Sequence, residues 1–151
     1  MIKIILQAGI SCFVGTIAFG ILFNIKRDKL LYAGFVGAVG GILYKCGIHL
    51  GWNEYLSNFI ASIGFSICCE ILARKLKTPV TTFTVCALIP LVPGGTLYNM
   101  MVEVIQGQTM QALSSGVKVV SISITLALGI LIVSTFFRIY NAYKTIENNV
   151  I

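Results

Sequence analysis

The stretch Ile89-Pro90-Leu91-Val92-Pro93-Gly94-Gly95 lies in the middle of an apolar segment that runs from about Val80 to Gln106. A proline inside a helix removes a backbone donor and clashes with the preceding turn. Two prolines followed by two glycines therefore predict an interruption of the helix. In a bilayer, freed backbone groups are tolerated only where protein or a water-filled cavity satisfies them. A helix broken at membrane depth is thus a candidate site for a substrate or an ion.

The composition around this stretch is that of a membrane protein. Of the 151 residues, 57% are hydrophobic and 11% are charged, with a mean hydropathy of +0.93. A soluble domain typically carries about 25% charged residues. The net charge is +6, but the basic residues gather at the ends of apolar segments and form no aromatic-interleaved groove. The pattern therefore indicates a lipid bilayer as the surroundings and argues against nucleic-acid binding.

Five apolar segments are long enough to cross a bilayer, which takes about 20 helical residues. They are predicted at residues 4–23, 30–50, 55–72, 80–106 and 113–137, within one transmembrane domain over residues 1–151. The first lacks a small-residue cleavage pattern and is interpreted as a retained span. Loose ends are expected at Met1–Lys3 and about Asn141–Ile151. The predicted fold class is an all-α integral membrane protein with five transmembrane helices, the fourth broken near mid-membrane at Pro90–Gly95.

The turns between the spans alternate in charge, which predicts an orientation. One set of turns, with the C-terminal region, carries Lys26, Arg27, Lys29, Arg74, Lys75, Lys77, Arg138 and Lys144. The opposite turns, residues 51–54 and 107–112, contain no Lys or Arg. Because positive residues favour the cytoplasmic side, the N-terminus is expected outside and the C-terminus in the cytoplasm.

The break divides the fourth span into two half-helices with opposite ends exposed. From Val80 to Pro90 is about 15 Å of helix, half of a hydrocarbon core of about 30 Å. Carbonyls ending the first half suit a cation or an ammonium group. Free N–H groups opening the second half, near Gly95 or Thr96, suit a carboxylate. The candidate substrate-binding residues are Pro90, Pro93, Gly94, Gly95, Thr96, Tyr98 and Asn99.

Two alternatives stay open at the break. A proline kink can also shape packing alone, without a ligand. Thr96 and Asn99 can cap the second half-helix instead of contacting a ligand. Discontinuous helices of this kind nevertheless form substrate sites in many secondary transporters, and the clustering of polar side chains beside the break favours the site.

Charged residues inside the spans form two predicted pairs. Glu70 and Arg74 are spaced i and i+4, which suits either a structural ion pair near the cytoplasmic end or an ion-coupling role for the acid. Lys118 and Glu103 lie at similar depth on the fifth and fourth spans, which predicts a second pair. Lys45 is expected to extend its amine to the outer surface.

No constellation for catalysis or metal binding is visible. The cysteines, Cys12, Cys46, Cys68, Cys69 and Cys86, fall within apolar segments without a CxxC and are interpreted as small buried residues. The single histidine, His49, makes a zinc site improbable. No Ser-His-Asp arrangement or phosphate-cradling glycine loop occurs. We expect no enzyme, no cofactor and no metal.

Small residues recur at helical spacing along the first three spans. An example is Gly37-Ala38-Val39-Gly40-Gly41 in the second span. Such stripes let helices approach closely in lipid. They fit packing within the chain, and they also fit contact with a partner chain or a second copy.

Several of these segments together resemble one family. The run from Ile89 to Gly95, followed by Leu97-Tyr98, is similar to the signature of the threonine/serine exporter family, in its C-terminal five-helix half. The other matching segments are Ile21-Leu22-Phe23-Asn24, Ala33-Gly34 with Gly37–Gly41, Glu70-Ile71-Leu72-Ala73-Arg74 and Lys77-Thr78-Pro79. One departure is Ile25 after Asn24, where the family often has proline.

The resemblance implies a small subunit of a split two-component exporter in the bacterial inner membrane. A larger membrane subunit would supply the other half of the architecture. The implied substrates are small carboxylates, either threonine and serine or dicarboxylates such as succinate, with export driven by protons or ions. The alternative function is a non-transporting membrane scaffold that stabilises a partner protein. A passive homo-oligomeric pore is a third possibility, but few polar residues line one face of a span.

Overall fold

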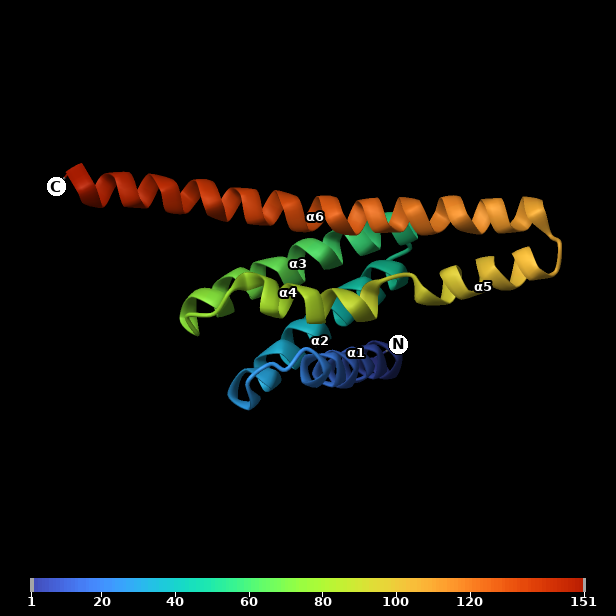
Figure 1. The fold of residues 1–151 in the computed structure, drawn as a ribbon, viewed down its shortest axis with the longest axis horizontal. Coiled ribbons are helices and arrows are strands. Elements are labelled where there is room, and N and C mark those ends of the chain that lie inside the picture. Colours follow the sequence, from blue (N-terminus) through green and yellow to red (C-terminus); the bar gives the residue numbers. More distant parts are fainter. Residues whose placement is uncertain (1, 151) are drawn as a thin grey trace.

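The computed structural model describes residues 2–150, with side chains from Lys3 to Tyr143; Met1 and Ile151 of the predicted loose ends lie outside the described residues. Within that range every regular element is a helix. The order is α1 (Ile2–Leu22), α2 (Arg27–His49), α3 (Glu54–Lys75), α4 (Val80–Leu88), the short 3-10 helix η1 (Ile89–Leu91), α5 (Gly94–Ile105) and α6 (Thr109–Val150) (Figure 1).

The helices confirm the predicted all-α membrane fold. Helices α1, α2, α3 and α6 are each long and apolar enough to cross a membrane, and the pair Val80–Leu91 and Gly94–Ile105 forms a fifth, bent span. Two expectations are wrong. Ile2 and Lys3 of the predicted loose N-terminal end already belong to α1, and the predicted loose tail from Asn141 continues α6 as far as Val150. No Gly or Pro follows Gly129 to stop the helix, and Arg74 of α3 donates a hydrogen bond to Asn141 Oδ1 (2.7 Å).

The four turns between spans share one backbone motif. At the end of α1, the N–H of Asn24 bonds to the Ile21 carbonyl (3.0 Å) and that of Ile25 to the Gly20 carbonyl (2.9 Å). This pairing satisfies the last carbonyls of a helix when the residue after the helix end is left-handed. The left-handed residues are Asn24, Gly51, Lys77 and Gly107, with φ of 56°, 80°, 47° and 73°. Each turn therefore reverses the chain within a few residues.

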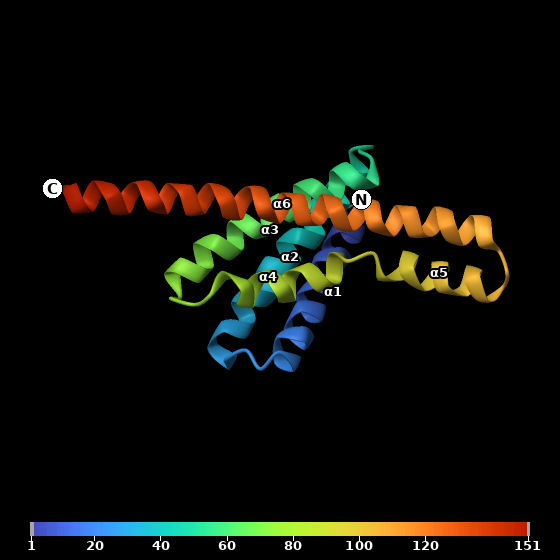
Figure 2. The ribbon, with the colours of Figure 1, turned by 45° about the horizontal axis from the view of Figure 1, so that its top comes forward.

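Helix α3 lies at the centre of the bundle. It packs against α2, α4 and α6, while α1 pairs with α2, and α5 packs extensively on α6 alone. Figures 1 and 2 show α6 running along the whole length of the molecule, with the α5–α6 turn at one end of it. The buried core draws on α2, α3, α4, η1 and α6 and includes Ala33, Val36, Ala61, Phe65, Cys69, Ala73, Phe83, Ala87, Leu91, Ile122 and Leu126.

Glycines let α1 and α2 approach closely. A Cβ added at Gly37 would lie 2.8 Å from Thr16 Cβ, and one added at Gly41 would lie 2.9 Å from Cys12 Cβ. Distances this short are excluded for real side chains, so only glycine permits this helix spacing. Of the two uses open for the glycine stripe, the second span uses these positions for packing within the chain.

The basic turns meet at one end of the bundle. Lys29 Nζ donates hydrogen bonds to the Thr78 hydroxyl and to the Leu76 carbonyl (3.4 Å). These contacts join the turn after α1 to the turn after α3. The turns that the charge pattern assigned to one side of the membrane therefore do lie together.

The α3–α6 contact depends on Gly129, and we expect Gly129→Ala to weaken it. The added Cβ would lie 2.9 Å from Ser62 Cβ and 3.1 Å from the Phe59 carbonyl oxygen, so α6 must move away from α3. Overpacking of this kind costs roughly 1–3 kcal/mol. The melting temperature of the detergent-purified protein should fall. Gly116→Ala is the matched control, because its added Cβ meets only the flexible Met100 thioether, at 3.2 Å. Equal melting temperatures for the two variants would contradict this account.

Candidate functional site

The break between α4 and α5 has a defined geometry. The chain leaves α4 through η1, becomes extended at Val92 (φ −60°, ψ 136°) and re-enters a helix after Pro93. The two half-spans meet at 51°. Neither proline offers an N–H, and the short bond from the Gly94 N–H to the Val92 carbonyl (2.7 Å) closes the turn. The prolines interrupt the helix, whereas Gly94 and Gly95 are the first two residues of α5.

The break lies beside the middle of neighbouring helices. A Cβ added at Gly15 of α1 would contact Pro90 at 3.7 Å, and one at Gly40 of α2 would lie 2.8 Å from Leu91 and 3.4 Å from Phe65 of α3. Those three positions are near the centres of their helices. If these helices cross a bilayer, the break is near its midplane.

A cavity of about 290 Å³ opens at the break. It is lined by Ala8, Cys12, Gly41, Tyr44, Lys45, Glu54, Asn58, Pro90, Leu91, Val92, Pro93, Gly94, Gly95, Thr96 and Ile122. Helices α1, α2, α3, α5 and α6 all contribute to the lining. A volume of this order suits a small solute.

The first turn of α5 forms one wall of the cavity. Pro93 precedes the helix, and the first hydrogen bond of the helix type is from the Leu97 N–H to the Pro93 carbonyl (3.0 Å). The N–H groups of Gly95 and Thr96 therefore have no acceptor within the helix. A Cβ added at Gly94 or Gly95 would meet nothing within 4 Å. These glycines leave the space beside the N–H groups open, which suits a carboxylate.

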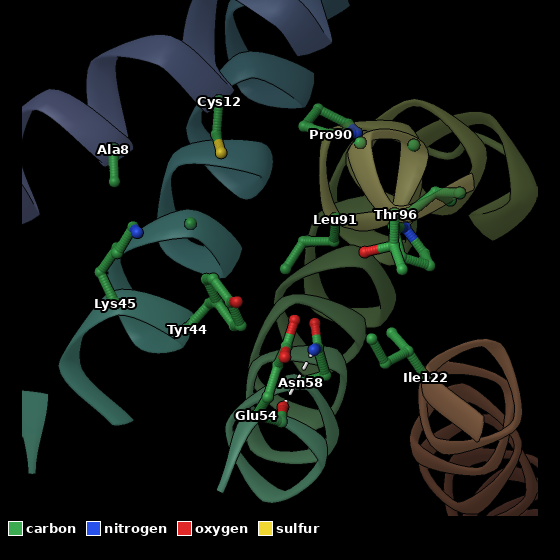
Figure 3. Close-up of a pocket in the computed structure, with 15 residues that line it drawn as sticks. Ala8, Cys12, Tyr44, Lys45, Glu54, Asn58, Pro90, Leu91, Thr96 and Ile122 are labelled. Carbon is green, nitrogen blue, oxygen red and sulfur yellow. Dashed lines mark hydrogen bonds between the residues drawn. The ribbon is translucent and has the colours of Figure 1, made fainter. Parts of the chain in front are cut away.

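Polar side chains on α2 and α3 face the same space. Figure 3 shows Tyr44 and Lys45 on one side of the cavity, and Glu54 and Asn58 below Thr96. Lys45 Nζ lies 5.7 Å from the Tyr44 ring centroid. Glu54 Oε2 accepts a hydrogen bond from Lys118 Nζ of α6 at 2.7 Å. The cavity thus holds both donor and acceptor groups in an otherwise apolar bundle.

Comparison with known proteins identifies the family. The profile of the family described as "Threonine/Serine exporter, ThrE" matches residues 8–136, which is most of the chain and includes the break and every residue of the cavity lining. The chain belongs to the threonine/serine exporter family. This is a family of transporters, not of enzymes. Among the described residues, no group of three or more His, Cys, Asp or Glu is placed to hold a metal ion.

One curated relative is distantly similar to this chain. A protein of Haemophilus influenzae, described only as uncharacterized, is 28% identical over 95 residues; the alignment covers 62% of this chain and 31% of the relative. The chain thus spans about a third of the length of the curated relative it matches. No solved structure matches it.

Part of the predicted exporter-family site comes together at the break. Pro90, Pro93, Gly94, Gly95 and Thr96 all line the cavity. Two further candidates, on the next turn of α5, are outside the cavity lining: Tyr98 is 67% exposed, and Asn99 is exposed as well. The capping role considered for Thr96 and Asn99 is wrong, because α5 begins at Gly94 without a side-chain cap.

The predicted pair between Lys118 and Glu103 is also wrong. Lys118 bonds to Glu54 instead, and Glu103 Oε2 is buried without a hydrogen-bond partner among the described residues. The prediction paired Lys118 with Glu103 only because the two residues lie at a similar depth along their spans. The start of α3 nevertheless lies closer to Lys118, because α3 and α6 run side by side in the same direction.

The predicted Glu70–Arg74 pair forms and reaches a third group. Arg74 Nη2 lies 3.5 Å from Glu70 Oε2 and 3.5 Å from the Phe137 carbonyl oxygen, and Nη1 donates to Asn141 Oδ1. The guanidinium also stacks over the Phe137 ring at 4.7 Å. Arg74 therefore binds the C-terminal end of α3 to α6, and it is outside the cavity lining.

The sequence alone did not predict that Tyr44, Glu54 and Asn58 line the cavity at the break. Glu54 and Asn58 are spaced i and i+4 at the start of α3, so a helix places them on one face. Their position at a span end indicates the water interface by itself. Only the folded bundle, in which α3 and α5 both line one cavity, brings them to the break.

Proposed function

We propose that this chain is the small membrane subunit of a two-component exporter of threonine, serine or similar small carboxylates. The observation that carries the proposal is the cavity at the break, where the open N–H groups of α5 face polar side chains of α2 and α3. In the proposed mode, the substrate carboxylate binds the N–H groups of Gly95 and Thr96. The Thr96 hydroxyl offers a further hydrogen bond.

The other predicted residues have supporting roles in this proposal. Pro90 and Pro93 hold the two half-helices apart, and Gly94 and Gly95 keep the space between them free of side chains. Tyr98 and Asn99 lie on the exposed side of α5. They can meet substrate only if another chain closes the cavity from that side.

A larger partner subunit is part of the proposal. None of the α5 residues is buried, although α5 forms half of the bent span. The relative from Haemophilus influenzae is about three times as long as the region it shares with this chain. A partner that supplies the missing length and covers α5 would account for both observations.

The proposed location is the bacterial inner membrane, with the N-terminus outside and the C-terminus in the cytoplasm. The contacts of Lys29 with Leu76 and Thr78 support one common side for the basic turns, and positive charge favours the cytoplasm. In this orientation α5 runs from mid-membrane toward the outside.

Dicarboxylates such as succinate are the second candidate substrates. Lys45 lines the cavity together with the α5 N–H groups. The Lys45 amine and these N–H groups could therefore each bind one carboxylate of a dicarboxylate. A non-transporting scaffold remains the rival in another class, but Gly37 and Gly41 are already occupied by packing within the chain.

The test is efflux from cells that carry the whole exporter. We expect deletion of this chain to abolish efflux of labelled threonine and serine, and re-expression to restore it, because the cavity belongs to the substrate path. The measurement is the efflux rate from preloaded cells, with succinate included as a third solute. Unchanged efflux of all three solutes in the deletion strain would refute the proposal. Loss of the partner from the membrane without any change in efflux would support the scaffold.

A further inference from the structure

The start of α3 presents an acceptor to the cavity. Asn58 is 3% exposed, and its Nδ2 donates a hydrogen bond to the Glu54 backbone carbonyl (2.9 Å). A carbonyl oxygen can pair only with the amide's N–H side, so this bond fixes the orientation of the amide. The Asn58 Oδ1 is therefore left as an acceptor, and Figure 3 shows it beside the Glu54 carboxylate, pointing the same way.

The Glu54 carboxylate retains capacity for a ligand. Lys118 Nζ occupies Oε2 at 2.7 Å, but a carboxylate offers about four acceptor positions. Each side chain is fixed by a neighbour: Glu54 by its ion pair with Lys118, and Asn58 by its hydrogen bond to the α3 backbone. Together they form a pre-arranged acceptor pair on one wall of the cavity.

Hydrogen-bond donors lie on the other wall of the cavity, at the start of α5. The N–H groups of Gly95 and Thr96 carry the positive end of α5, so the two walls suit a ligand with one negative and one positive end. We propose that Glu54 and Asn58 bind the α-ammonium group of the substrate and thereby select amino acids over dicarboxylates of similar size. This assignment rests on the proposed function and names the substrate class of that site.

A dicarboxylate fits these two walls poorly. Its second carboxylate would face the carboxylate of Glu54 and the amide oxygen of Asn58, with no proton to share between acceptors. A buried polar group left unpaired costs more than a missing hydrogen bond alone. Sites built to hydrogen-bond a substrate group therefore reject analogues that lack the group.

The experiment uses inside-out vesicles from native cells that retain the rest of the exporter. Uptake of labelled threonine, succinate and 3-hydroxybutyrate, which is threonine without its ammonium group, is measured for the wild type, Asn58→Leu and Glu54→Gln. We expect the wild type to favour threonine at least tenfold over the other two solutes. Each variant should lose tenfold or more of its threonine uptake and bring the three rates close together.

Two further variants make the result specific. Asn58→Asp keeps the size and the acceptor, loses the hydrogen bond to the Glu54 carbonyl, and should retain the preference for threonine because its carboxylate attracts an ammonium group. Glu54→Gln carries the test if Asn58→Leu is missing from the membrane. Ser66→Ala is the matched control, because Ser66 is buried on the same helix, its Oγ has no hydrogen-bond partner among the described residues, and it is outside the cavity lining. Uptake is normalised to the amount of each variant in the vesicles.

The outcomes separate this assignment from the proposed function. If wild-type vesicles take up threonine but Asn58→Leu and Glu54→Gln both keep the wild-type preference, the ammonium site is wrong and the exporter stands. A wild type that prefers succinate also overturns the ammonium site. If wild-type vesicles take up none of the solutes above the deletion strain, both proposals fall.

Discussion

Gly95→Leu should abolish export and leave the protein folded. A Cβ at this position meets nothing within 4 Å, and leucine is a better helix former than glycine by about 1 kcal/mol, so the helix should tolerate the change. The leucine side chain would instead occupy the cavity and cover the N–H groups at the start of α5. We expect efflux to fall at least tenfold, equivalent to ~1.4 kcal/mol of lost binding or more.

The measurements are the efflux rate of labelled threonine and the melting temperature of the purified protein. Gly95→Ala should give a smaller loss, because a methyl group fills less of the cavity. Ala18→Leu is the control for added bulk, since Ala18 is exposed on α1 and outside the cavity lining. Wild-type efflux in the Gly95→Leu protein would leave the break with a packing role only.

Arg74→Gln should destabilise the protein more than any change at Glu70. It leaves the Glu70 carboxylate buried, with 8% of the residue exposed, and without its cation. Removing one partner of a fully buried pair costs roughly 3–5 kcal/mol; the Arg74 side chain is 36% exposed, so water moderates the cost to about 2 kcal/mol. The bond to Asn141 is lost as well. The folded yield in detergent and the melting temperature should both drop.

The companion variants separate the two roles open for Glu70. Glu70→Gln/Arg74→Gln removes the unpaired charge and should recover most of the lost melting temperature. Glu70→Gln alone should keep wild-type efflux at every pH tested, because the carboxylate binds Arg74 beside α6 and away from the cavity lining. A flattened pH profile of efflux in Glu70→Gln would instead assign the ion-coupling role to this acid.

The span pattern is the part of the fold that the sequence predicts well. Apolar length and basic turns depend on local composition, so the helices lie within a few residues of the predicted spans. The tail beyond Asn141 is the exception. A polar composition removes the reason to enter lipid but not the ability to form a helix, and the Arg74 bond to Asn141 Oδ1 comes from another helix.

The candidate site was predictable only where it is local. Pro90 and Pro93 break a helix through their own covalent geometry, and the family signature lies in the same run. The partners of charged groups are not local. Lys118 was matched to Glu103 by depth, yet it bonds to Glu54, because the rotation of each helix about its axis decides which neighbour a side chain meets.

The sequence by itself therefore determined that the chain crosses a membrane, roughly where each span lies, and that the fourth span is interrupted. These properties follow from hydrophobic length and from backbone groups that proline removes. Only the tertiary structure decided that Gly94 and Gly95 line an open cavity and that Glu54 and Asn58 face it. These residues lie about 40 positions apart in the sequence, and the packing of the helices brings them to one cavity, not any local preference of the chain.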